Sequence, residues 1–177
     1  MPTPLNEFKH LTKLIAEALG KPGHRTFRIM AESGSRWAVM WVEKEQLLQL
    51  SVALRQLLVS TQAEAQSEEP SRRRRPRGAS DQINLEFKVG KILLGHDSES
   101  GNVVIDAHDV ESEGDGEKSR AVLRVWVTRA QAEWFSEQSL EVCAAGRPIC
   151  PLCGGPINPE GHVCPSTNGH YKDARQL

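Results

Sequence analysis

One short pattern occurs twice in this chain and constrains its fold more than any other feature. VMWVEKEQL at residues 39–47 aligns with RVWVTRAQA at residues 124–132 without a gap, so that Trp, Val and Gln recur at matching positions. In both copies an apolar strand runs directly into a segment with helical spacing. The match extends to Ser51 and Ser136. The chain is therefore expected to hold two copies of one strand-to-helix unit.

The sequence around each copy predicts three strands followed by a helix. In the first half, residues 25–32 and 36–42 flank a Ser-Gly-Ser turn, which is typical of a hairpin, and leucines from Leu47 to Leu58 recur at helical spacing. In the second half, strands are expected at 84–95, 103–111 and 120–127, and a helix at 131–145.

Two local signals bear on the ends of these units. Thr128 and Gln131 have the spacing of a capping box, which fixes the start of the last helix. FKHLTKLIAEALG, near the N-terminus, suits an amphipathic helix, but the repeat places a strand at residues 13–19. We favour the strand, because two copies of one unit explain more of the chain.

The predicted fold class is α+β. Two βββα repeats form a mostly antiparallel sheet packed with two helices, and a zinc-knuckle tail follows at the C-terminus. Residues 60–81 are rich in Ser, Pro, Glu and Arg without apolar periodicity, as in a disordered linker or long loop. The expected divisions are the first repeat at 1–60, the linker at 61–81, the second repeat at 82–146 and the tail at 147–177.

The tail holds a candidate metal site. Cys150 and Cys153 are two residues apart in CPLC, and eight residues later come His162 and Cys164. Three thiols and one imidazole are a ligand set for tetrahedral zinc, and four local ligands would close the shell around a structural ion. His170 is an alternative fourth ligand. The remaining cysteine, Cys143, lies near the end of the predicted helix and is expected in the core.

The cellular compartment and charge narrow the function classes. MPTPLNEF has neither the basic start nor the apolar run of a signal peptide, so a cytoplasmic protein with reduced thiols is expected. The net charge is −1, which favours no general attraction to nucleic acid or membrane. No phosphate-binding loop motif is present in the sequence.

An arginine run offers a second candidate contact, with nucleic acid or an acidic partner. Across residues 60–81, five arginines face four acidic residues, so the local net charge is only +1, and no aromatic residue interleaves with them for base stacking. A solvated linker explains the run equally simply. The candidate contact residues are Arg72, Arg73, Arg74, Arg75 and Arg77.

A third candidate is Asp106, His108 and Asp109 in VVIDAHDVE, a possible hydrolase cluster. On a strand Asp106 and His108 share one face, and Asp109 points the other way. The simpler interpretation is a polar strand edge that faces solvent. No catalytic residue is therefore assigned.

The sequence resembles an uncharacterised family of bacterial proteins of about this length. The resemblance rests on Gly23-His24-Arg25-Thr26-Phe27, on the strand-to-helix repeat and above all on the tail, residues 144–169. It covers nearly the whole chain, implies His162 rather than His170 as the fourth ligand, and implies no activity. The chain departs from the family pattern in CPSTNG, where an Arg more often follows CP, and in its arginine-rich linker.

These observations predict a zinc-binding protein with a structural ion that acts as a non-enzymatic binding or adaptor protein. Its zinc tail and sheet surface would engage another macromolecule, which is expected to be a protein. Two alternatives stay open: a nucleic-acid-binding protein that uses the arginine run and the tail, and a hydrolase that uses the region of Asp106 and His108.

Overall fold

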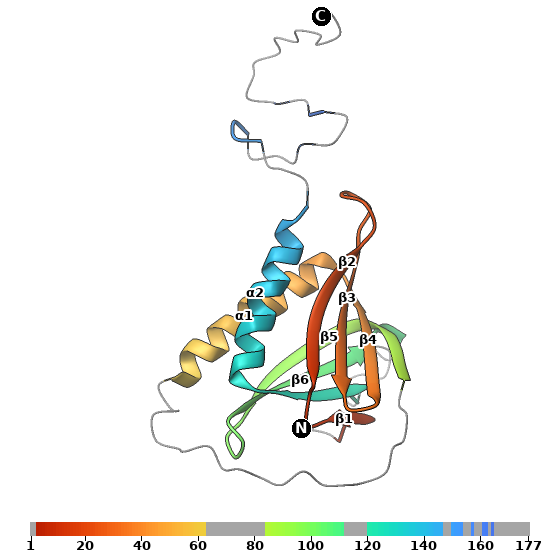
Figure 1. The fold of residues 1–177 in the computed structure, drawn as a ribbon, viewed down its shortest axis with the longest axis vertical. Helices are drawn as coiled ribbons and strands as arrows, with labels where there is room; N and C mark the ends of the chain where they lie inside the picture. The colour runs from red at the N-terminus through yellow and green to blue at the C-terminus, as the bar shows by residue number, and fades with distance from the viewer. Residues whose placement is uncertain are drawn as a thin grey trace, which may run out of the picture.

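The structure, a computed structural model, describes residues 3–62, 84–111, 120–146, 150–153, 157, 161–162 and 164. The described residues form a sheet and two helices (Figure 1), the α+β class that the sequence predicts. In chain order the elements are β1 (Asn6–Phe8), β2 (Lys13–Leu19), β3 (Thr26–Ser33), β4 (Arg36–Val42), α1 (Lys44–Gln62), β5 (Asn84–Asp97), β6 (Asn102–Asp109), β7 (Leu123–Val127) and α2 (Arg129–Ala144).

The strands form a single sheet in the order β1-β7-β6-β5-β4-β3-β2. Neighbouring strands are antiparallel except in two pairs, β4 with β5 and β1 with β7, which are parallel. The β4–β5 pair joins the strands of the two halves of the chain. A parallel pair needs a crossover connection, and α1 lies in the segment that provides it.

Strand β5 serves both halves of the sheet. Residues 84–88 pair with β4, residues 89–97 pair with β6, and the register shifts between Val89 and Lys91. Such a bulge bends a strand. Strand β5 thus makes one parallel and one antiparallel pairing. In the first half of the chain two separate strands make these pairings, since β1 pairs in parallel with β7 and β2 pairs antiparallel with β3. Only residues 9–12 join β1 to β2, so the two edges of the curved sheet come close at that corner (Figure 1).

Several local predictions are confirmed. Residues 13–19 form strand β2, and the alternative of a helix there is wrong, because Leu14 and Ala16 alternate inward with the two-residue period of a strand. The capping box is present, since the Thr128 side chain accepts a hydrogen bond from the Gln131 amide and the Gln131 side chain accepts one from the Thr128 amide. The short strand β1 was not predicted.

The element order contains the succession β-β-β-α twice, in β2-β3-β4-α1 and in β5-β6-β7-α2. That the two units superpose stays a prediction. Helix α1 runs to Gln62, so the first two residues of the expected linker are helical, and the remainder of that linker, residues 63–81, lies outside the described residues. The expected domain boundaries likewise stay predictions.

The core lies between the sheet and the two helices, which pack on each other and, through α2, on β2 (Figure 1). Strands β2 and β3 turn alternate residues toward it, and the helices contribute Leu47, Leu54 and Phe135, which are fully buried. Full burial of one such side chain stabilises the fold by about 1.5–3 kcal/mol. The largest fully buried apolar side chains are Phe8, Phe135, Leu47, Leu54, Leu123, Val89, Val103, Val125 and Val127. Neither described helix is long and apolar enough to cross a membrane.

Candidate metal centre

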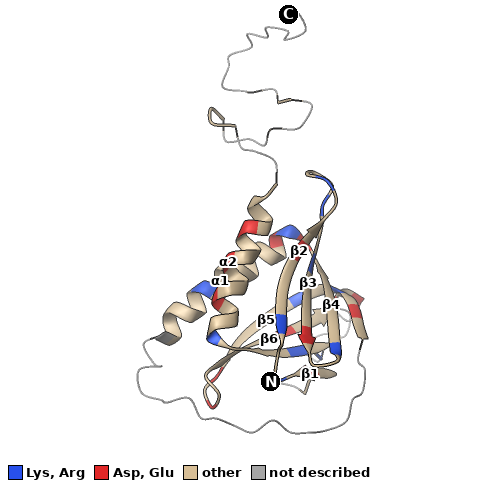
Figure 2. Ribbon diagram, in the orientation of Figure 1, with Lys and Arg blue, Asp and Glu red and all other residues tan. Residues whose placement is uncertain are grey.

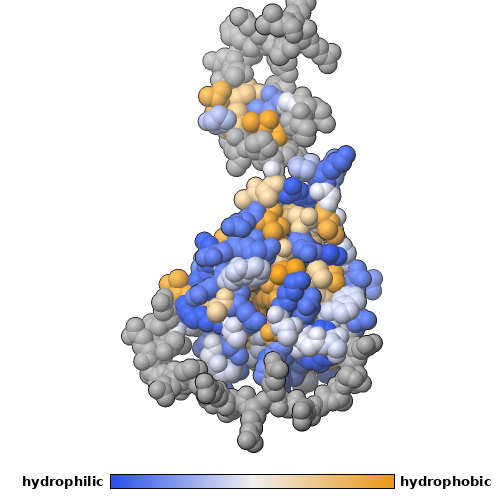
Figure 3. Space-filling model, in the orientation of Figure 1, coloured by the Kyte–Doolittle hydropathy of each residue, from blue (hydrophilic) through white to orange (hydrophobic). Residues whose placement is uncertain are grey.

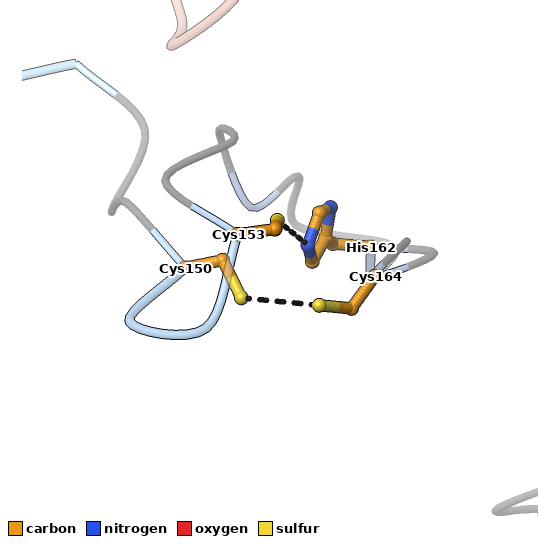
Figure 4. Close-up of side chains that lie close together, drawn as sticks. All are labelled: Cys150, Cys153, His162 and Cys164. Carbon is orange, nitrogen blue, oxygen red and sulfur yellow. Dashed lines mark hydrogen bonds between the residues drawn. The ribbon is translucent and has the colours of Figure 1, made fainter. Parts of the chain in front are cut away.

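The tail brings together the four residues that its spacing singled out. One ligand atom from each of Cys150, Cys153, His162 and Cys164 lies within 4.8 Å of the other three (Figure 4). The Sγ atoms of Cys150 and Cys164 are 3.7 Å apart, and the Sγ of Cys153 lies 3.1 Å from Nε2 of His162. Among the described residues this is the one group of three or more His, Cys, Asp or Glu with such geometry. The arrangement is able to bind a metal ion.

The distances suit a tetrahedral ion. Zinc–sulfur bonds of about 2.3 Å at tetrahedral angles place two sulfurs about 3.8 Å apart. The Cys150–Cys164 separation is close to this value. The Cys153–His162 separation is shorter and requires a small outward movement when an ion enters. The set of three thiols and one imidazole is the donor chemistry that tetrahedral zinc prefers.

Backbone hydrogen bonds around Cys150 favour the thiolate form of its side chain. Hydrogen bonds from the backbone amides of Cys153 and Leu152 lower the pKa of the Cys150 thiol to about 6. The thiolate, which is the form that binds metals, therefore predominates at neutral pH. Cys150 is buried, and Cys153, His162 and Cys164 are half-buried.

The ligand pair of His162 and Cys164 follows a glycine with an unusual backbone conformation. Gly161, directly before His162, has φ of +107°, a conformation that residues with a Cβ rarely adopt. A Cβ there would meet no atom within 4 Å, so backbone conformation and not space favours the glycine. His170 and the rest of residues 165–177 lie outside the described residues. The choice between His162 and His170 thus rests on the placement of His162 alone.

Cys143 is separate from this cluster. It lies on α2, is 4% exposed and belongs to the hydrophobic core, as the sequence predicts. Burial raises the pKa of its thiol, and the charge of Lys44 opposes this only in part. A buried neutral thiol of this kind is a core residue and not a metal ligand.

Asp106 and His108 lie on one face of β6, but the predicted solvent-facing edge is wrong. Strand β6 is an interior strand between β5 and β7, and the two side chains belong to residues that are 3% and 6% exposed. Asp106 accepts hydrogen bonds from Nε and Nη2 of Arg124 on β7, the first at 2.6 Å. Burial lowers the pKa of His108, and the nearby Asp106 carboxylate opposes that shift.

The contribution of Arg124 was missed from the sequence, although a signal existed. Arg124 interrupts the apolar residues of β7, and register places it directly opposite Asp106. A bidentate arginine–carboxylate pair is among the stronger polar contacts in proteins. Both carboxylate oxygens of Asp106 therefore accept hydrogen bonds from Arg124. The arginine run at residues 72–77 lies outside the described residues.

Comparison with known proteins gives a family but no activity. No curated protein and no solved structure matches the chain. A family model described as "Protein of unknown function (DUF3090)" matches residues 6–164, a stretch that runs from the first strand to the last of the four clustered ligands. The chain therefore belongs to the DUF3090 family.

Proposed function

We propose that this protein binds one structural zinc ion through Cys150, Cys153, His162 and Cys164, and that it acts as a non-enzymatic binding protein. The observation that carries the proposal is the convergence of these four ligand atoms within 4.8 Å. Zinc is the metal that best fits three thiolates and one imidazole, because hard cations such as magnesium and calcium require oxygen ligands.

A structural role follows from the number of ligands. Catalytic zinc sites usually have three protein ligands and keep a fourth position for water or substrate. Here four protein ligands fill a tetrahedral shell, so an ion bound by all of them has no open position. The energy of binding would instead hold together a loop with few apolar residues.

The rival hydrolase receives no support from the geometry. Asp106 already accepts two hydrogen bonds from Arg124, so its carboxylate is poorly placed to act as a base. We therefore favour a protein that engages another macromolecule. All four cysteines are free thiols, which agrees with a reducing compartment, and we propose a cytoplasmic location.

The first prediction concerns metal content. Protein purified without chelator should contain one zinc per chain by elemental analysis, and Cys153→Ser should lose it, because three remaining ligands bind the ion far more weakly. Cys143→Ser is the matched control. It removes a thiol that lies in the core and should retain the full zinc content.

Two results would contradict the proposal. One is wild-type protein without metal, and the other is equal loss of zinc from Cys153→Ser and Cys143→Ser. The fourth ligand is tested separately with His162→Ala and His170→Ala. Only His162→Ala should reduce zinc affinity.

A further inference from the structure

The second half of strand β5 has a neighbouring strand on one edge only. Residues 84–88 pair with β4 on one side, and residues 89–97 pair with β6 on the other. Strand β4 ends at Val42, so from Lys91 to Asp97 no described strand lies on the β4 side. We name this side of residues 91–97 the open edge. An unpaired strand edge presents N–H and C=O groups that can pair with another chain.

The sheet register identifies the counterpart of the open edge in the first half of the chain. Leu94 is linked across β6 to Val125, and Ala16 is linked across β3 to Met40. Met40 and Val125 are matched in the two aligned windows. Leu94 therefore corresponds in register to Ala16, and the open edge corresponds to the outer edge of β2.

The two helices treat these corresponding edges differently. Gln138 of α2 accepts a hydrogen bond from the Ala16 amide at 2.9 Å and donates one to the Ala16 carbonyl at 2.6 Å. At the spacing that matches Ser51 with Ser136, the position in α1 that aligns with Gln138 is Ala53, whose methyl group forms no hydrogen bond. Helix α1 also makes a smaller contact with β5 than α2 makes with β2.

Side-chain exposure shows the same difference. On β2, Leu14 and Ala16 are 4% and 1% exposed. Their counterparts in register on β5, Ile92 and Leu94, are only half-buried. Leu93, on the other face of the strand, is 36% exposed. The open edge is thus apolar and less covered than the edge that α2 protects.

The backbone groups of Leu94 face the open edge. The bonds from Gln138 show that the N–H and C=O of Ala16 point away from β3. By the correspondence in register, those of Leu94 point away from β6. Because these directions alternate along an antiparallel strand, Ile92 and His96 also direct their backbone groups outward.

The sequence of the open edge is complementary to itself. Antiparallel pairing of all seven residues with a second copy places Leu94 on the two-fold axis, opposite Leu94 of the partner. Lys91 of one protomer then lies opposite Asp97 of the other, and opposite charges at such positions stabilise strand pairing. Leu93 lies opposite Gly95, which leaves room for the leucine side chain.

Both charges are available for this contact. Among the described residues neither Lys91 nor Asp97 forms an ion pair. Asp97 lies at the acidic turn of the β5–β6 hairpin (Figure 2), where its carboxylate accepts hydrogen bonds from the Glu99 amide and the Ser100 hydroxyl. A carboxylate has about four acceptor positions, so these two bonds leave room for a lysine.

We propose that two copies of the protein associate through their open edges, so that β5 of each protomer pairs antiparallel with β5 of the other and joins the two sheets. Main-chain hydrogen bonds supply most of the affinity in strand addition, so no large apolar surface is needed. This agrees with the face seen in Figure 3, where hydrophilic side chains surround smaller apolar areas. The inference goes beyond the proposed function and involves none of the metal ligands.

Sedimentation equilibrium of the full-length, zinc-loaded protein tests the dimer from about 1 µM to about 1 mM, the range of weak association. Wild-type should form dimers within it. Lys91→Glu and Asp97→Lys should each raise the dissociation constant about tenfold, because every dimer then holds two like-charged pairs. An equimolar mixture of the two variants should recover wild-type association, since their introduced charges attract across the interface.

Two further variants separate this contact from general effects. Lys21→Glu makes the same charge change at an exposed lysine that has no ion pair among the described residues, and it should keep the wild-type dissociation constant. His96→Pro removes an outward N–H at an exposed side chain, a change that an edge strand tolerates, and it should abolish association. Circular dichroism and zinc content should match wild-type for all variants, so failure of the dimer is distinguishable from failure of the metal site.

Hydrogen exchange at the Leu94 amide gives a second readout, which should slow as protein concentration rises. Four outcomes would overturn the proposal. They are a monomer at every concentration, equal effects of Lys91→Glu and Lys21→Glu, no recovery when Lys91→Glu and Asp97→Lys are mixed, and protection of the Leu94 amide that is independent of concentration. The last would indicate that a segment of the same chain covers the open edge.

Discussion

Asp106 and Arg124 form the most buried ion pair among the described residues, with side chains 4% and 11% exposed. The aligned windows match Arg124 with Val39 of the first half, and Val39 lies opposite Met30 just as Arg124 lies opposite Asp106. One half thus has an apolar pair where the other has a buried ion pair. A buried ion pair generally stabilises a fold no more than a well-packed apolar pair does.

This comparison predicts how the ion pair responds to substitution. Arg124→Val should lower the free energy of unfolding by about 3–5 kcal/mol, because the Asp106 charge stays buried without its main partner. Asp106→Met together with Arg124→Val copies the pair of the first half and should restore most of the loss. Urea denaturation followed by tryptophan fluorescence measures both. A single variant as stable as wild-type would show that Asp106 is solvated well enough to tolerate the change.

How far single residues could be predicted depended on whether their partners were local. The clustered ligands were found because all four lie within one short stretch, whose spacing alone indicates a metal. The role of Asp106 was not found, because its burial depends on β5 and β7 lying on either side of it. Alternation along a strand gives the face of a residue but not what covers that face.

At the scale of elements, Gln46 and Gln131 explain why one glutamine recurs in the aligned windows. The side chain of each accepts a hydrogen bond from a backbone amide at the start of its helix, from Glu43 and Thr128 respectively. Each also donates to a backbone carbonyl of a segment distant in sequence. Gln46 donates to Val89 and Gly90, and Gln131 donates to Leu11. The glutamine thus caps a helix and ties it to a bend in the sheet.

Another glutamine completes an edge of the sheet. Strand β2 is the last in the strand order, so one edge of its backbone has no neighbouring strand. Gln138 of α2 covers that edge at Ala16, since it accepts from the Ala16 amide at 2.9 Å and donates to the Ala16 carbonyl at 2.6 Å. An open strand edge otherwise invites pairing with other chains.

Gln138→Met should therefore destabilise the protein by about 1–3 kcal/mol, because it leaves a partly buried donor and acceptor without partners. Hydrogen exchange at the Ala16 amide should become faster than at neighbouring β2 amides. Gln49→Met is the control. Gln49 is exposed on α1 and bonds only to Glu45 among the described residues, so its replacement should change stability by less than about 0.5 kcal/mol. Equal effects of the two substitutions would refute the role of Gln138.

Element types were predictable where periodicity is strong, and β1 shows the limit. It has three residues, too few to establish a period, and it exists because it pairs in parallel with β7, far away in sequence. Glu-Phe-Lys occurs at residues 7–9 in and after β1 and again at residues 86–88 in β5, and both phenylalanines are buried. The same three residues thus occur at the two segments that take part in parallel pairing, β1 with β7 and β5 with β4.

At the scale of the whole molecule, the core and the metal centre draw on different parts of the chain. The core cluster begins at Phe8, ends at Cys143 and includes no described residue of the tail. It draws on both halves of the chain, which share one sheet. The metal ligands all lie after α2. The stability of the body should thus be independent of the metal.

Removal of the metal tests this separation. A strong chelator should leave the far-ultraviolet circular dichroism and the unfolding midpoint of the body unchanged, while amides from residue 150 to residue 164 exchange faster. Iodoacetamide should then modify Cys150, Cys153 and Cys164 but spare Cys143, whose pKa is raised by burial and whose thiol lies in the core. Re-addition of zinc should protect the three tail thiols again. A fall in the midpoint of more than about 3 °C, roughly 1 kcal/mol for a chain of this size, would mean that the tail supports the body.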